Sequence, residues 1–396
     1  MKKQLTTILF CLLLVAPVCR AATPMKKVIE TGLERARQQS LLMAESLKDK
    51  DGRLPRTTDK DGKLTTSDSR WWCSGFFPGV LWYLYEDSKD NRFKTFAELY
   101  TARVEREKYT TDNHDVGFML YCSFGNGLRI TGNESYKDVL LTGAKSLCTR
   151  YNPDLGVIKS WQTSKKWQYP VIIDNMMNLE LLMWAYKNSN EQRFADISLS
   201  HADKTMREHY RPDYSCYHVV SYDTIALVPE KKQTAQGYAD ESAWARGQAW
   251  GLYGYTMMAR MSGKQDYRDQ ARKIASFLMN HPNMPKDKVP YWDFNAPDIP
   301  NTVRDASSAA IMASALIELS QIVGGKEGKR YLAYAEDQIR SLTTPGYLAE
   351  AGTNGNFVLK HSTGSLPGNS EVDVPLTYAD YYYVEALLRL KRIYGL

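Results

Sequence analysis

The sequence predicts an all-α fold, a closed (α/α)6 barrel made of six helical hairpins. Two observations lead to this prediction. Six helix-length segments are apolar on nearly all sides, which is typical of buried helices, and six amphipathic, charged segments alternate strictly with them. Turn-forming strings such as TGNES, SNEQ and VGGKEGK separate neighbouring segments. An inner ring of apolar helices inside an outer ring of amphipathic helices would bury every apolar face.

The inner helices are expected where aromatic and small residues follow a polar or glycine-containing start. They begin at Gly75 (GFFPGVLWYLYE), Val116 (VGFMLYCSFGNGLRI), Asn175 (NMMNLELLMWAYK), Arg246 (RGQAWGLYGYTMMARM), Ala306 (ASSAAIMASALIELSQI) and Ala379 (ADYYYVEALLRLKRI). The outer helices are expected over 26–47, 92–107, 136–148, 192–208, 265–279 and 327–342. The uneven spacing of the inner segments disfavours a solenoid with a fixed sequence period.

Five long connections between the predicted helices are rich in polar and aromatic residues. They span 50–72, 152–173, 211–245, 282–305 and 343–378. In a closed ring these loops gather at one rim, and long ordered loops are where binding and catalytic residues concentrate. A functional site is therefore expected at that rim.

The first 22 residues are predicted to be a signal peptide, followed by a single domain over 23–396. Lys2 and Lys3 give a basic start, an apolar stretch follows, and Ala21 and Ala22 suit cleavage. No later segment reaches the roughly 20 apolar residues that a membrane span requires. The mature protein is expected to be exported, to the periplasm, with no membrane attachment after cleavage.

Charge and cysteine content exclude several classes of function. The formal net charge of +6 falls to +3 when the three cations of the signal peptide leave, which is too weak to indicate nucleic acid as a partner. The four cysteines beyond it, Cys73, Cys122, Cys148 and Cys216, lack zinc-site spacing, and we expect buried thiols, with one disulfide as an open alternative. No metal, no cofactor and no obligate protein partner are predicted.

Two aspartates are the candidate catalytic acids. Asp115 and Asp174 each precede a buried inner segment, so both are expected at helix mouths, where they could face one pocket as acid and base. The alternative is that each carboxylate only caps its helix, since aspartate is a favoured N-cap. His114 and Asn175 stand beside them.

A second group of residues suggests a site for an anionic sugar. Arg246, flanked by Trp244 and Trp250, fits a carboxylate grip lined by aromatic rings, or alternatively a structural salt bridge at the rim. Trp71, Trp72, Phe76 and Phe77 suit an aromatic wall or simply the core. His218 and Gln236, on the loop before Arg246, are candidates to bind hydroxyls or are ordinary loop residues. His201 is expected to be solvated on an outer helix.

At these residues the chain resembles the unsaturated glucuronyl hydrolases of glycoside hydrolase family 88. The resemblance covers essentially the whole mature chain through HDVGF, VIIDNMMN, SAWARGQAW and EVDVPLTYADYYYVEALLR. The related unsaturated rhamnogalacturonyl hydrolases of family 105 share the fold and both aspartates, but usually have Asn-Gly where Gln248 and Ala249 stand here. The residues therefore favour family 88. That second specificity and a non-catalytic glycan-binding protein are the alternatives.

The resemblance implies a substrate and a mechanism. The substrate would be a lyase-generated glycosaminoglycan oligosaccharide of chondroitin, hyaluronan or heparin type, ending in a 4,5-unsaturated uronic acid. Asp174 would protonate C4 and then take a proton from the water that adds at C5, while Asp115 supports it. The resemblance places around the sugar His114, Trp72, Phe76, Asn175, His218, Gln236, Trp244, Arg246 and Trp250. Ser362 and Ser365 fit a sulfate-binding Ser-x-x-Ser-x-Lys segment of some members, although Pro367 replaces its lysine.

Overall fold

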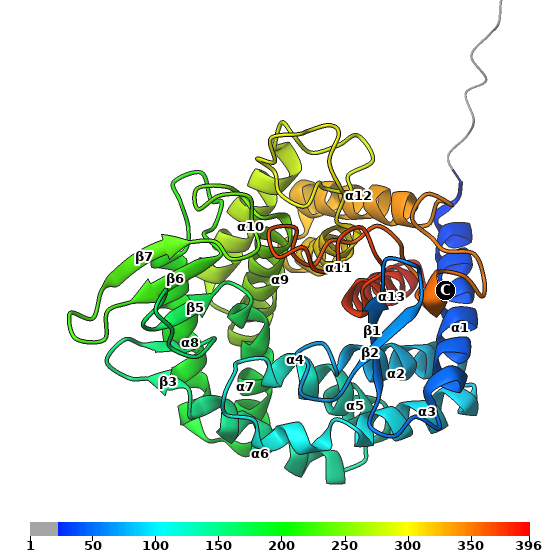
Figure 1. Ribbon diagram of the computed structural model, residues 1–396, viewed down its shortest axis with the longest axis horizontal. Coiled ribbons are helices and arrows are strands. Elements are labelled where there is room, and N and C mark those ends of the chain that lie inside the picture. The colour runs from blue at the N-terminus through cyan, green and yellow to red at the C-terminus, as the bar shows by residue number, and fades with distance from the viewer. Residues whose placement is uncertain (1–22) are drawn as a thin grey trace, which may run out of the picture.

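The computed structural model describes residues 23–396, and the predicted signal peptide lies outside them. Viewed along the barrel, the helices form two concentric rings (Figure 1). The inner ring contains α2 (Phe76–Ser88), α4 (Val116–Leu120) continued by α5 (Asn126–Thr131), α7 (Asn175–Ser189), α9 (Ala245–Ser262), α11 (Ala306–Val323) and α13 (Thr377–Ile393). The outer ring contains α1 (Met25–Leu47), α3 (Asn91–Ala102), α6 (Ser135–Cys148), α8 (Gln192–Glu208), α10 (Gln265–Asn280) and α12 (Gly325–Leu342). The predicted (α/α)6 barrel is confirmed.

The burial of each ring follows the sequence pattern. In the outer helix α10 the buried residues recur every three or four positions, at Tyr267, Ala271, Ile274 and Leu278, so one face packs inward. The inner helix α11 is buried on all sides and packs against α9, α12 and α13. Its 18 residues are long and apolar enough to span a membrane, but 78% of them are buried within this fold. The four cysteines at 73, 122, 148 and 216 are buried free thiols.

Three details of the predicted helices were wrong. The first two concern the continuity and the length of a helix. The second inner helix is interrupted by a π-turn over Tyr121–Gly125. There the side chains of Ser123 and Asn126 donate hydrogen bonds to the carbonyls of Met119 and Cys122, respectively. These bonds disturb the regular backbone hydrogen bonds of the helix. The outer helix expected to reach 107 ends at Ala102, and a 3-10 turn follows over Glu105–Tyr109.

The third error concerns His201, which is not solvated. Its side chain is buried, and its Nδ1 accepts a hydrogen bond from the backbone N–H of Ile158 at 3.0 Å. The imidazole thus ties the outer helix α8 to the strand that contains Ile158. His201 was expected at the surface because it is a polar residue on an amphipathic helix. Its hydrogen-bond partner, Ile158, is distant in the sequence, so the helical pattern did not reveal it.

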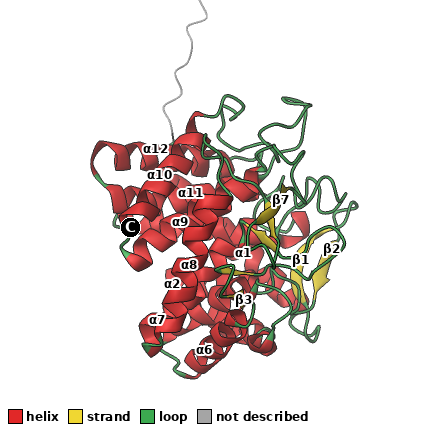
Figure 2. Ribbon diagram, turned by 90° about the vertical axis from the view of Figure 1, so that its left-hand side faces the viewer, coloured by secondary structure: helices red, strands yellow, loops and turns green. Residues whose placement is uncertain are grey.

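The long connections lie at one end of the barrel, as predicted, and hold all of the described strands (Figure 2). Two antiparallel pairs are formed, by β1 (Leu54–Thr58) with β2 (Leu64–Ser67) and by β3 (Tyr151–Asn152) with β4 (Val157–Ile158). A three-stranded antiparallel sheet has the order β5 (Pro170–Ile172), β6 (Val219–Tyr222), β7 (Pro229–Gln233). These loops build the walls above the inner helices.

The inner helices α4 and α7 approach each other unusually closely at Gly117. A Cβ atom placed on Gly117 would lie 2.7 Å from the Cα of Asn178, which is closer than real Cβ contacts. The side chain of Asn178 also crosses the contact, because its Oδ1 accepts from the backbone N–H of Phe118 at 2.9 Å. Asp115 and Asp174 precede these two helices, so this contact sets their separation.

We expect Gly117→Ala to destabilise the protein by about 1–3 kcal/mol, because the added methyl group pushes α4 away from α7. Thermal unfolding would measure the loss. Gly346→Ala is the matched control, since its methyl group would meet only the Thr344 hydroxyl at 3.4 Å. Equal stability of the two variants would show that the close contact does not constrain the helices.

Candidate active site

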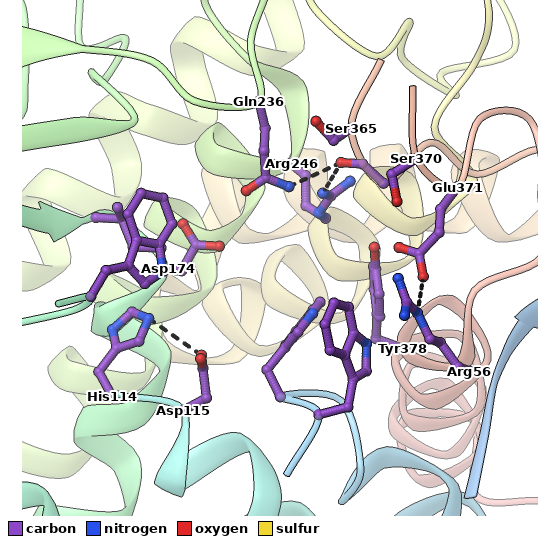
Figure 3. Close-up of a pocket in the computed structure, with 15 residues that line it drawn as sticks. Arg56, His114, Asp115, Asp174, Gln236, Arg246, Ser365, Ser370, Glu371 and Tyr378 are labelled. Carbon is purple, nitrogen blue, oxygen red and sulfur yellow. Dashed lines mark hydrogen bonds and ion pairs between the residues drawn. The ribbon is translucent and has the colours of Figure 1, made fainter. Parts of the chain in front are cut away.

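A cavity of about 230 Å³ opens at the end of the barrel that carries the loops (Figure 3). Residues that precede or begin inner helices contribute to its lining, so the positive ends of several helix dipoles point toward it and favour an anionic ligand. Its lining consists of Arg56, Trp71, Trp72, His114, Asp115, Trp161, Ile172, Asp174, Gln236, Arg246, Gly364, Ser365, Ser370, Glu371 and Tyr378.

Asp115 and Asp174 both face this cavity (Figure 3). Each occupies the N-cap position of its helix, α4 or α7, but neither side chain makes a capping hydrogen bond. Their side chains are only 14% and 12% exposed. The capping interpretation is therefore wrong for both residues, and the carboxyl groups are available to a ligand.

The two carboxyl groups are difficult to ionise together. Burial raises the pKa of Asp174 to about 7, and Arg246 opposes this shift. Burial and the charge of Asp174 raise the pKa of Asp115 to about 8, opposed by Arg150. Removal from water penalises the charged forms, and a like charge in the same cavity adds to the penalty. The pair therefore holds a proton near neutral pH, as an acid–base site requires.

A neutral histidine lies beside each acid. His218 Nδ1 accepts from the backbone N–H groups of Ala235 and Gln236, at 3.1 and 3.3 Å, which leaves the ring proton on Nε2. That Nε2 lies 3.7 Å from Asp174 Oδ2. Burial lowers the pKa of His218 well below its usual range, and lowers that of His114, whose Nε2 is 3.3 Å from Asp115 Oδ1, to about 3. The histidines thus lie beside the acids without adding charge.

Arg246 makes the structural salt bridge that was one of its two predicted roles, and its role as a carboxylate grip stays a prediction. It makes a buried salt bridge, with Nη1 3.1 Å from Asp305 Oδ2, and its Nη2 donates to the carbonyl of Gly364 at 2.6 Å. Its guanidinium carbon lies 4.5 Å from the ring centre of Trp244 and 5.4 Å from that of Tyr378. Arg246 also lines the cavity, so a rigidly held positive charge faces the two acids.

The other predicted site residues fall into two groups. Those lining the cavity, besides the acids and Arg246, are His114, Trp72, Gln236 and Ser365. Those buried behind the lining are Phe76, Asn175, His218, Trp244, Trp250 and Ser362.

The buried group supports the lining residues. Phe76 packs against Trp72 with ring centres 5.8 Å apart, and Trp244 stacks on His218 at 4.4 Å. Trp250 is fully buried, and its indole, whose N–H has no hydrogen-bond partner among the described residues, lies close enough to Asp174 to lower the pKa of that acid. Their proposed contacts with sugar stay predictions, whereas their packing positions the residues that face the cavity.

Several lining residues were missed. Arg56, Trp161, Ile172, Ser370 and Glu371 lie on strands and loops that no helical periodicity marks. Tyr378 lies within one of the recognised motifs, but nothing in the sequence distinguished it from core tyrosines; its hydroxyl is buried without a hydrogen-bond partner in the described residues. Within 23–396 there is also no cluster of three or more His, Cys, Asp or Glu side chains suited to a metal.

The raised pKa values predict a pH-dependent stability effect for Asp115→Asn. Folding raises the pKa of both acids above 3.8, so the stability they contribute is present at low pH and is lost as the pH rises through about 7 to 8. The uncharged asparagine avoids this loss. We therefore expect the variant to unfold about 2–4 °C higher than the unsubstituted protein at pH 8.5, with a smaller difference at pH 5.

Thermal unfolding at both pH values tests this, with Asp154→Asn as the control because Asp154 is exposed in the loop between β3 and β4. A variant that is destabilised equally at both pH values would contradict a buried, poorly ionised pair.

Comparisons with a family model and with a curated protein point to the same family. The family model described as Glycosyl Hydrolase Family 88 matches residues 46–392. The chain is 47% identical over 327 residues to an unsaturated glucuronyl hydrolase of Formosa agariphila, covering 82% of this chain and 81% of that protein.

Two solved structures that resemble this chain are also unsaturated glucuronyl hydrolases. One, a crystal structure of an unsaturated glucuronyl hydrolase specific for heparin, is 46% identical with a TM-score of 0.91, covering 94% of this chain and 99% of that chain. Another, an unsaturated glucuronyl hydrolase responsible for the degradation of glycosaminoglycan from Bacillus sp. GL1, is 31% identical with a TM-score of 0.84, covering 91% and 97%. The barrel, the paired acids and these matches show that the chain belongs to glycosyl hydrolase family 88.

Proposed function

We propose that this protein is an unsaturated glucuronyl hydrolase that releases the 4,5-unsaturated uronic acid from the non-reducing end of lyase-generated glycosaminoglycan oligosaccharides. The observation that carries the proposal is the pair of uncapped, poorly ionised acids facing one cavity. At about 230 Å³ the cavity is smaller than most ligand pockets, which suits one terminal sugar rather than a chain. The names of the two solved relatives support the glycosaminoglycan class.

In the proposed reaction, Asp174 donates its proton to C4 of the C4=C5 double bond. The positive charge that develops at C5 and the ring oxygen lies beside carboxylate groups, which stabilise it. Water then adds to C5 and gives one proton to the Asp174 carboxylate, which restores the acid. The hemiketal formed at C5 opens, and the rest of the oligosaccharide leaves. One carboxyl group serves as acid and base because the proton it gives is replaced.

Arg246 couples substrate binding to the protonation of Asp174. In the free protein the positive charge of Arg246 lowers the pKa of Asp174 and favours its carboxylate form. A uronate bound beside Arg246 neutralises that charge, so the pKa of Asp174 rises and its protonated form is favoured. His218 Nε2 lies 3.7 Å from Asp174 Oδ2, and the other oxygen of Asp174 is the one that would face C4. Binding of the substrate thereby favours the protonated form of Asp174 that the reaction requires.

Export belongs to the proposal as well. Its support is the basic start, the apolar stretch and the small residues of 1–22, which together are typical of a signal peptide. A periplasmic enzyme would meet oligosaccharides cut by lyases before they enter the cytoplasm.

We expect Asp174→Asn to lower kcat by about 10²–10⁴-fold, because the amide can neither give nor take the proton. The measurement is the loss of ultraviolet absorbance of the vinyl ether in unsaturated chondroitin, hyaluronan and heparin disaccharides. Asp154→Asn makes the same chemical change at an exposed position and is expected to retain full activity.

Undiminished turnover by folded Asp174→Asn would disprove the proposed mechanism. Tight disaccharide binding by the unsubstituted protein without any absorbance change would instead indicate a glycan-binding protein.

A further inference from the structure

Arg150 is a buried arginine near the active-site cavity, and no carboxylate bonds to its guanidinium within 23–396. It follows the outer helix α6 and is only 8% exposed. Its Nε donates to the carbonyl of Lys159 at 2.7 Å, and its Nη1 and Nη2 donate to those of Thr111 and Trp161 at 2.7 and 3.3 Å. Charged side chains are rarely buried unless they are paired, so the charge of Arg150 is expected to have a function.

The hydrogen bonds of Arg150 join two loops of the active site. Thr111 stands at the start of the loop that leads to Asp115, and Trp161 lines the cavity. Gln162 strengthens the same connection, because its Nε2 donates to a carbonyl of the first loop at 2.9 Å. These bonds explain why a donor is present at position 150. They do not explain why the donor is charged, since a neutral amide donates to carbonyls as well.

The charge of Arg150 acts on Asp115 without contact. No hydrogen bond or salt bridge joins the two side chains in the described part of the chain, yet the guanidinium opposes the rise in the pKa of Asp115 and lowers the pKa of His114. The other charged or titratable groups near the guanidinium are Asp112, Lys159 and Tyr169. Asp112 is exposed, so water weakens the effect of its negative charge, and Lys159 adds a positive one. Asp115 therefore experiences a net positive charge from this side.

The two acids thus have different arginines. Arg246 lies near Asp174 and lines the cavity, where it would meet a bound uronate, whereas Arg150 does not line the cavity (Figure 3). A uronate that neutralises Arg246 leaves the charge of Arg150 unchanged. Binding of the substrate then favours the proton on Asp174 and the carboxylate form of Asp115.

We propose that Arg150 is a positioning residue for hydration of the C4=C5 double bond: its permanent charge favours the ionised form of Asp115 in the substrate complex, so that Asp174 holds the proton. The inference rests on the proposed function. There Asp174 gives its proton to C4, and a neighbouring carboxylate stabilises the positive charge that develops at C5. Asp115 is that carboxylate only while it is ionised. Without the charge of Arg150 the proton would reside more often on Asp115, and both roles would be impaired.

The experiment separates the charge of Arg150 from its hydrogen bonds. Arg150→Gln keeps a donor and removes the charge, whereas Arg150→Lys keeps the charge. We expect Arg150→Gln to lower kcat, by as much as about tenfold, and to move the acidic limb of the pH profile of kcat about one unit to higher pH, because Asp115 then takes up a proton more readily. Arg150→Lys should retain the acidic limb of the unsubstituted enzyme and most of its kcat, and any loss should appear in KM or in thermal stability.

A matched control and a second readout accompany the pH profiles. Arg103, at the end of the outer helix α3, also donates three hydrogen bonds to backbone carbonyls, at 3.2, 2.7 and 2.7 Å, and does not line the cavity. Arg103→Gln should therefore leave the pH profile unchanged. The side-chain ¹³C signal of Asp115 should titrate at higher pH in Arg150→Gln than in the unsubstituted protein, and at the same pH in Arg103→Gln.

The outcomes separate this inference from the proposed function. If Arg150→Gln has the same acidic limb and the same Asp115 midpoint as the unsubstituted enzyme, the inference is overturned while the proposed function stands. An acidic limb displaced by about one unit in Arg150→Lys would also overturn it, and this test holds even if Arg150→Gln does not fold. If the unsubstituted enzyme hydrolyses no unsaturated glucuronyl disaccharide, the proposed function fails and this inference fails with it.

Discussion

Two acids are brought into one cavity by the close contact of α4 and α7, and the chemistry of the site depends on that constraint. Gly117 allows the two helices to touch backbone to backbone, and Asn178 fixes their register. Asp115 and Asp174 stand just before these helices without capping them. Since both carboxyl groups are buried in one cavity, ionising the second is unfavourable. The fold thereby keeps a proton available near neutral pH.

The residues around Asp115 and Asp174 affect the protonation of the two acids, but they do not neutralise the charge of the pair. The two histidines beside the acids are uncharged, so they do not strongly stabilise the ionised forms of the carboxyl groups. Among residues 23–396, the cation that lowers the pKa of Asp174 is Arg246, which is already engaged by Asp305 and by backbone carbonyls. An arriving uronate changes the balance around Arg246 and therefore around Asp174. Binding and protonation are in this way linked through one buried guanidinium.

The sequence predicted the barrel and its acids because both depend on local patterns. All-round apolar segments mark inner helices, and Asp115 and Asp174 each precede one. Periodicity identifies a helix but not which residues face a cavity: Phe76 and Trp250 lie behind the lining, and their contacts with sugar stay predictions. The ion pair of Arg56 and Glu371 joins residues 315 positions apart, which no local pattern reveals.

The raised pKa of both acids is the central claim, and ¹³C NMR of aspartate side-chain carboxyl carbons tests it most directly. Signals of Asp115 and Asp174 can be assigned by their absence from spectra of the corresponding asparagine variants. We predict that both titrate far above 3.8, near pH 7 to 8, and that the Asp115→Asn substitution lowers the midpoint of Asp174 by removing a like charge. Two signals that titrate independently near 3.8 would show that the cavity holds two ordinary carboxylates, and would contradict this account.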